Sequence, residues 1–325
     1  MSVIQRFNPI NKEEQREKFL FDPYYNPQFK YDDGISDEEL SKYGQISDEY
    51  QDVALHILQS VIKKYGSESQ YLRQVEGELL TQQQVTQAIE NYLVSLGLAK
   101  SMTINMTIKL SRNFIARTSV YKNTINVRLP IEHREKSLKS TLNHEIATHY
   151  LRNINDERQP WHKNRKEFGL RDYIESEEGL AVIHYYLDLE VKYLWLQAMY
   201  YYAATQAVYM TFSELFLHLE QFIDDRSRRW KICLRVKRGL RDTSIPGVFT
   251  RDQVYFKGTI RIAKWLVKND FDPTALYVGK IDILDLPKVK KIQNSEGIIL
   301  PPFLQVKEVY INSLKQLIKD NNLPI

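Results

Sequence analysis

The stretch that decides the fold lies near the middle of the chain and reads Leu142-Asn143-His144-Glu145-Ile146-Ala147-Thr148-His149-Tyr150-Leu151-Arg152. Apolar residues recur at four-residue steps from Leu138 to Tyr150, as one face of a helix requires. Neutral imidazole is a common zinc ligand, and a glutamate beside the first histidine is where a hydrolytic zinc site keeps its general base. The stretch therefore predicts a helix that carries a metal site.

The spacing of the two histidines departs from the usual four residues. His144 and His149 are five residues apart, so on an ideal α-helix their side chains diverge by about 140°. A π-type turn between them brings both rings to one side, and such turns concentrate at functional sites. We therefore expect a non-ideal turn around Ala147. The alternative is an ordinary core helix that happens to carry two histidines and a glutamate.

A catalytic zinc ion normally has three protein ligands, so a third one is needed. The segment Ser176-Glu177-Glu178-Gly179-Leu180-Ala181 opens the next expected helix and offers two carboxylates. Spacing alone does not decide between Glu177 and Glu178, and either could instead complement the dipole at the helix N-terminus. His184 is expected to be a buried core histidine.

Composition limits the class of protein. Of the 325 residues, 43% are hydrophobic, and we expect neither a signal peptide nor a membrane-spanning run. Cys233 is the only cysteine, which excludes disulfides and favours a reducing compartment. Residues 1–50 hold 6 Lys or Arg and 11 Asp or Glu, so with a net charge of +4 the remainder carries +9. This basic body suits an acidic partner, and without a nucleic-acid-binding motif we expect no nucleic acid and no membrane as partner.

The expected elements give an α+β fold. Alternating apolar residues predict strands at 104–110 and 119–129, the second crossing a polar turn at Lys122-Asn123. A strand edge beside the metal helix could hold an extended peptide by main-chain pairing. A loop is expected at 152–175. The expected helices cover residues 36–65, 81–96, 176–190, 193–208, 212–236, 252–268 and 303–320.

Two parts are expected along the chain. Residues 1–34 should form an extended aromatic arm packed on the body, because Pro23 and Pro27 exclude regular structure while the many rings there need cover. Residues 35–325 contain no linker and no repeat, so we expect a single domain in which a small sheet lies beside the metal helix.

Several ordered motifs together resemble one family, the microtubule-associated tyrosine carboxypeptidases, which are zinc enzymes that remove the C-terminal tyrosine of α-tubulin. The resemblance rests on residues 142–152, Arg158-Gln-Pro-Trp-His162, Glu177-Glu-Gly-Leu-Ala181 and Lys237-Arg-Gly-Leu-Arg-Asp-Thr-Ser244. Further similar blocks are Asn8-Pro-Ile-Asn11, Tyr25-Asn-Pro-Gln-Phe29, Pro246-Gly247 and Asp252-Gln-Val-Tyr255. The resemblance covers almost the whole chain.

The resemblance implies a mainly α-helical metallopeptidase domain with one zinc ion. It assigns His144, His149 and Glu178 as metal ligands and Glu145 as the catalytic base. It also implies the α-tubulin tail and microtubules as partners, and a cytoplasmic, cytoskeletal location on microtubules or the axoneme. Ala147 departs from the glycine more usual in the family. The alternative is a microtubule-associated binding protein that keeps the fold without activity.

A carboxypeptidase also needs a cation for the terminal carboxylate, and the planar fork of arginine suits that task. Eight basic residues lie between Arg226 and Arg241, and for those up to Arg235 we favour a solvated helix face. The residues that follow belong to a structured loop marked by Gly239. We expect substrate contacts from Lys237, Arg238, Arg251, Gln253 and Tyr255, with Arg238 or Arg251 on the carboxylate.

Overall fold

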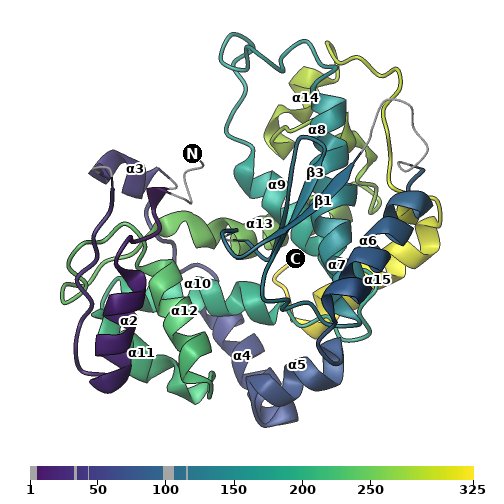
Figure 1. Cartoon of the computed structure of the whole chain (residues 1–325). Helices are drawn as coiled ribbons and strands as arrows, with labels where there is room; N and C mark the ends of the chain where they lie inside the picture. The colour runs from purple at the N-terminus through teal and green to yellow at the C-terminus, as the bar shows by residue number, and fades with distance from the viewer. Residues whose placement is uncertain (1–5, 33–34, 43, 98–105, 115) are drawn as a thin grey trace. The chain divides into compact units, whose positions relative to one another are not determined.

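The computed structural model describes residues 6–32, 35–42, 44–97, 106–114 and 116–325 (Figure 1). Within these ranges most elements are helices and there is one three-stranded sheet, which confirms the expected α+β fold. None of the helices in these ranges is both long and apolar enough to cross a bilayer. The chain divides into a first unit, residues 1–72 with 193–256, and a second unit, residues 73–192 with 257–325. The expected arm at 1–34 and single domain at 35–325 stay a prediction.

The first unit is built from helices, of which α10 (Trp195–Ala207) packs against α4 (Gln51–Tyr65) and α12 (Arg226–Val236). In the N-terminal segment, the ring of Phe19 lies 5.0 Å from that of Phe212, and the ring of Phe29 lies 6.3 Å from that of Trp230. The helices are α2 (Lys12–Phe21), α3 (Asp37–Ser41), α4 (Gln51–Tyr65), the start of α5 (Glu68–Glu76), α10 (Trp195–Ala207), α11 (Phe212–His218), α12 (Arg226–Val236) and the start of α13 (Gln253–Lys268).

Two expected helices of this unit are each divided in the structure. The helix expected at 36–65 is α3 and α4, separated near Gly44, whose φ of 76° lies in the left-handed region that glycine favours. The helix expected at 212–236 is α11 and α12, because Asp225 caps a new helix by accepting a hydrogen bond from the Arg228 amide at 2.7 Å. The solvated face expected up to Arg235 is wrong for Arg229, which is 2% exposed.

The second unit contains one long helical run, α7 (Ser137–Leu142), η1 (Asn143–Tyr150) and α8 (Leu151–Asp156). The run continues five residues, 152–156, into the loop expected at 152–175, since Leu151 and Asn155 are buried and α8 packs against the 3-10 segment η4 (Thr274–Val278). The other helices are α6 (Gln82–Ser95), α9 (Ile174–Tyr185), most of α13, α14 (Leu286–Val289) and α15 (Lys307–Asp320), with 3-10 turns η4 (Thr274–Val278), η5 (Ile283–Asp285) and η6 (Pro302–Leu304).

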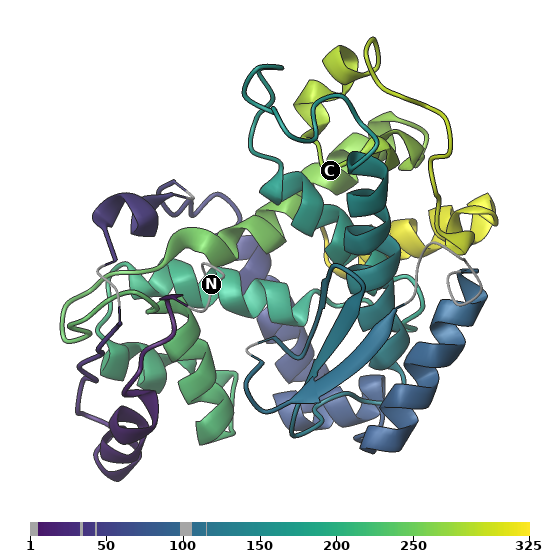
Figure 2. The same ribbon diagram turned by 45° about the horizontal axis from the view of Figure 1, so that its top comes forward.

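The sheet lies in the second unit and has the strand order β1-β3-β2. β1 (Thr107–Ser111) is parallel to β3 (Thr124–Arg128), and β2 (Thr118–Tyr121) is antiparallel to it across the expected turn at Lys122-Asn123. The expected strand residues 104 and 105 lie outside the described residues. Figures 1 and 2 both show the sheet alongside the helical run, and β2 contacts η1. The expectation of a small sheet beside the helix that carries the two histidines is confirmed.

Candidate metal centre

The helical run changes from α-helix to π-helix where it carries the two candidate histidine ligands. Residues Asn143–Tyr150 form a π-helix, in which hydrogen bonds join residues five apart. Residues at that spacing lie one above the other, and the rings of His144 and His149 are 4.7 Å apart between centroids. The expected non-ideal turn around Ala147 is confirmed, and the alternative of an ordinary α-helix is excluded for this segment.

Three potential ligand atoms converge at the π-helix. Nε2 of His144 lies 3.1 Å from Nε2 of His149, and Oε2 of Glu178 lies 3.7 Å and 3.4 Å from these nitrogens. In a tetrahedral zinc site with bonds of about 2.0–2.1 Å, ligand atoms are about 3.3 Å apart. Two imidazoles and a carboxylate are also the donor set of many hydrolytic zinc sites. The residues therefore fit a metal ion of the size and preference of zinc.

Helix α9 brings Glu178 to this point through a close helix crossing. A Cβ atom on Gly179 would lie 2.2 Å from the carbonyl oxygen of Gly258 on α13, so only glycine permits this approach. The same helix contacts η1. The close packing of α9 on α13, which Gly179 permits, therefore sets the position of Glu178 next to it.

Each histidine also has a hydrogen-bond partner on α9, which orients its ring. Nδ1 of His149 lies 2.7 Å from Oε1 of Glu177, and His144 is hydrogen-bonded to the main chain of Ala181. A histidine that donates from Nδ1 presents an unprotonated Nε2 to a metal. Glu177 and Glu178, which spacing does not distinguish, thus take different places: Glu178 faces the Nε2 atoms and Glu177 holds Nδ1.

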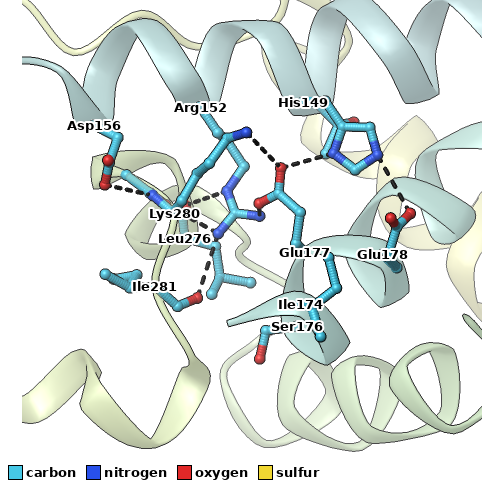
Figure 3. Close-up of polar contacts among 12 residues, drawn as sticks. His149, Arg152, Asp156, Ile174, Ser176, Glu177, Glu178, Leu276, Lys280 and Ile281 are labelled. Atoms are coloured by element: carbon cyan, nitrogen blue, oxygen red, sulfur yellow. Dashed lines mark hydrogen bonds and ion pairs between the residues drawn. The ribbon is translucent and has the colours of Figure 1, made fainter. Parts of the chain in front are cut away.

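A buried arginine holds Glu177 in turn (Figure 3). Nη1 of Arg152 forms an ion pair with Oε2 of Glu177, and the arginine has no exposed surface. Its other nitrogens donate to the carbonyl oxygens of Leu276 at 2.8 Å and Gly279 at 2.9 Å. Lys280 adds a second positive charge, with Nζ 3.8 Å from Oε1 of Glu177. Sequence reasoning missed this role of Arg152 because the carbonyl groups that hold the arginine lie more than a hundred residues later.

Burial and neighbouring charges shift the pKa values of the two histidines in opposite directions. Burial, together with the adjacent His149, lowers the pKa of His144 to about 4. Burial also acts to lower the pKa of His149, but the carboxylate of Glu178 and the hydrogen bond that His149 donates to Glu177 outweigh it and raise that pKa to about 10. The group as a whole therefore attracts a cation, either a proton on His149 or a metal ion in its place.

Glu145 lies beside the convergence point. Its Oε1 is 3.9 Å from Nε2 of His144, and its side chain is 21% exposed. Burial raises the pKa of Glu145 to about 7, against the opposing charge of His149. A carboxyl group with a pKa near neutrality can both accept and return a proton, which a general base and acid must do.

The five residues predicted to bind substrate all lie in the first unit. Lys237 is fully buried, and its ammonium donates to the carbonyl oxygens of Ala207, at 3.1 Å, and Met210. Gln253 is also buried, and its side chain donates to the carbonyl oxygen of Gln45 at 3.2 Å. Both side chains thus serve the scaffold of the unit.

Arg238 and Arg251 form a cationic cluster with Arg235. Arg235 makes two hydrogen bonds of 2.8 Å to the carboxylate of Asp252, and its guanidinium lies 5.8 Å from the centre of the Tyr255 ring. Burial, with the charges of Arg235 and Arg251, lowers the pKa of Arg238 to about 10. Nε of Arg238 is buried without a hydrogen-bond partner in the described chain. A cluster with this excess of positive charge suits an anion.

Comparison with known proteins gives one family. A family model described as microtubule-associated tyrosine carboxypeptidase matches residues 33–320. The proteins named microtubule-associated tyrosine carboxypeptidase 1 from Rattus norvegicus and Mus musculus are each 33% identical to this chain over 324 residues, which are 99% of the chain and 69% of each relative. The Homo sapiens protein of the same name is 33% identical over 324 residues, 68% of its own length.

Proposed function

This chain belongs to the microtubule-associated tyrosine carboxypeptidase family, and from that premise we propose that it is a zinc carboxypeptidase that removes the C-terminal tyrosine from the acidic tail of α-tubulin. The observation that carries the proposal is the convergence of Glu178 from α9 with His144 and His149 on the π-helix that also carries Glu145. The three ligand atoms suit zinc in spacing and in kind, and the carboxylate of Glu145 lies beside them, 3.9 Å from Nε2 of His144, where a general base is needed.

The chemistry divides between the metal and the protein. Zinc bound by His144, His149 and Glu178 would lower the pKa of water and polarise the peptide carbonyl. Glu145 takes the proton of the attacking water and returns it to the departing amine of tyrosine. Glu177 keeps His149 in the tautomer that presents Nε2, and Arg152 keeps Glu177 charged.

To bind the polypeptide that is cut, the protein needs two further features, which we assign as part of the proposal. β2 is an edge strand that contacts the π-helix, so it can pair with the main chain of an extended peptide. Arg238 and Arg251 supply the bidentate donors that a terminal carboxylate prefers, and Tyr255 lies near Arg235 of the same cluster. The basic charge of residues 51–325 favours the acidic tail of tubulin.

Microtubules are the proposed partner, and a cytoplasmic location at the cytoskeleton follows from that partner. The relatives are named for both microtubule association and tyrosine carboxypeptidase activity. Co-sedimentation with microtubules tests the partner separately from the reaction. Binding that weakens as salt rises is expected, because the attraction between a basic protein and an acidic tail is screened by ions.

The test of the reaction is the variant Glu145→Gln, which keeps the shape of the side chain and removes its basicity. We expect one bound zinc per wild-type chain, and in the variant a fall of about 10²- to 10⁴-fold in release of tyrosine from α-tubulin. Thermal unfolding and zinc content of the variant should stay at wild-type values. Glu157→Gln, on an exposed residue, is the matched control. Wild-type protein that binds zinc and microtubules yet releases no tyrosine would instead identify a binding protein without activity.

A further inference from the structure

The buried side of the π-helix carries a chain of hydrogen bonds that metal binding does not require. His184 on α9 has no exposed surface; its Nδ1 lies 2.8 Å from Oγ1 of Thr148, and its Nε2 lies 3.1 Å from Oη of Tyr310. Oγ1 of Thr148 in turn donates to the carbonyl oxygen of Asn143 at 2.8 Å. The chain therefore runs from α15 through α9 into the first residue of the π-helix.

The directions of these bonds follow from the donors available. The hydroxyl proton of Thr148 is used on Asn143, so Thr148 accepts the proton of His184 Nδ1. Nε2 of His184 then accepts from the hydroxyl of Tyr310. This assignment needs a neutral imidazole, and burial lowers the pKa of His184 well below its usual value. Both ring nitrogens of His184 and the hydroxyl of Thr148 then have a complementary partner, and Nδ1 of His184 also lies 3.4 Å from Oη of Tyr277.

A second contact reaches the same helix from the 3-10 segment η4. Tyr277 is fully buried, and its hydroxyl donates to the carbonyl oxygen of Ala147 at 2.9 Å. A carbonyl inside a regular α-helix is satisfied by the amide four residues later, so a donor from outside is useful where the ladder is interrupted. The two outside contacts thus fall on Ala147 and Thr148, between the two candidate histidine ligands.

We propose that Thr148, His184 and Tyr277 are positioning residues that select the π register of residues 143–150 and thereby bring His144 and His149 to one side. In an α-helical register successive side chains are rotated by about 100° around the helix axis. Over the five residues from His144 to His149 this makes the two histidines diverge by about 140°. Thr148 could not then meet both Asn143 and His184. The consequence for metal binding rests on the proposed function, whereas the register itself does not.

The experiment compares variants that remove one hydroxyl with a matched control. Thr148→Val and Tyr277→Phe keep shape and lose the donor, and Thr148→Ser restores the hydroxyl. The control is Thr141→Val in α7, because Thr141 is also buried and donates to a main-chain carbonyl, that of Ser137 at 3.2 Å, but lies in the α-helical part of the run. Amide hydrogen exchange of residues 143–151 is measured after a chelator has removed the metal. Zinc affinity is measured by competition with a chelator. The visible spectrum of the Co²⁺ form reports the geometry of the site.

The expected result separates the register from general stability. Thr148→Val and Tyr277→Phe should speed exchange at residues 143–151 by about tenfold or more, weaken zinc binding by about 10- to 100-fold and change the Co²⁺ spectrum. Thr148→Ser and Thr141→Val should stay near wild type in all three. Wild-type exchange in both hydroxyl-deleted variants, or an equal effect in Thr141→Val, would overturn the proposal. A wild-type chain that binds no zinc would overturn the proposed function alone, since exchange after chelation still decides the register. If Thr148→Val does not fold, Tyr277→Phe decides.

Discussion

A histidine can offer a metal only one of its two ring nitrogens, and in this chain the second nitrogen of His149 is taken by Glu177. The carboxylate sits between that ring and the buried guanidinium of Arg152, with Lys280 nearby. These two positive groups, together with the hydrogen bond to His149, outweigh burial and hold the pKa of Glu177 well below its usual range. The charge on Glu177 therefore serves both the orientation of His149 and the burial of Arg152.

Replacing Glu177 with glutamine should expose both roles. The amide can still accept a hydrogen bond from His149, but it leaves the Arg152 charge buried without its counter-ion. We expect a loss of about 3–5 kcal/mol in the free energy of unfolding without zinc, as for other broken buried pairs, and zinc binding about 10- to 100-fold weaker. Urea unfolding and chelator competition measure the two effects.

The control for this variant is Glu175→Gln on the same helix. Glu175 forms only a longer ion pair with Arg261, at 3.7 Å, and its side chain is 31% exposed. Its replacement should change the free energy of unfolding by less than about 1 kcal/mol and leave zinc affinity at the wild-type value. Equal effects of the two substitutions would show that the carboxylate at Glu177 has no special part in the metal centre.

At the scale of elements, the crossing of α9 and α13 sets how close Glu178 comes to the histidines. The Gly179→Ala variant puts a methyl group about where the Gly258 carbonyl now lies, and backbone cannot move aside as a flexible side chain would. We expect α9 to shift away from α13, with a loss of about 1–3 kcal/mol from overpacking and weaker zinc binding. Gly258→Ala should act alike, because its Cβ would meet the carbonyl oxygen of Glu175 at 2.2 Å.

The matched control for the helix crossing is Gly97→Ala. Gly97 has a φ of 71°, and no atom of the described residues lies within 4 Å of an added Cβ, so alanine there strains the backbone without meeting any of them. It should cost about 1–2 kcal/mol of stability while zinc affinity stays unchanged. Unfolding curves and zinc titrations of the glycine variants make the comparison. Normal zinc affinity in both Gly179→Ala and Gly258→Ala would contradict the role given to the crossing.

The elements that sequence could predict are those whose evidence is local. The five-residue gap between His144 and His149 has chemical meaning only if both face one side, so the π-turn could be expected before the structure was known. The breaks between α3 and α4, near Gly44, and between α11 and α12, at Asp225, also have local signals: a glycine in the left-handed region and an N-cap residue. Hydrophobic periodicity does not predict these breaks, because apolar residues continue at helical spacing through both.

The part of the metal centre that sequence could not predict depends on contacts between distant segments. Neighbours on a helix point about 100° apart, so the choice between Glu177 and Glu178 depends on how α9 crosses its partners. Arg152 acquires its role only when residues 276–281 fold over it. The same holds for Tyr277, which sequence gave no reason to single out.

At the scale of the molecule, the candidate metal centre belongs to one of the two units, and that unit is assembled from two separated stretches of chain. Residues 73–192 supply the candidate ligands. Residues 257–325 supply the groups that hold them: the Gly258 contact with α9, the carbonyl oxygens that bind Arg152, and the Tyr277 hydroxyl on the π-helix. A metal ion bound by the first stretch should therefore also stabilise the second.

This coupling gives a prediction for hydrogen exchange with and without zinc. A ligand that binds only the folded state stabilises it by about 2.7 kcal/mol at a concentration 100 times its Kd. Amides that exchange by local opening of the second unit should gain protection at residues 143–156, 174–185 and 274–283 together. Those of α4 and α10 in the first unit should change little. His149→Ala, which removes a ligand, should abolish the gain. Protection confined to residues 143–150 would show that the stretch after residue 257 only packs nearby and takes no part in holding the metal.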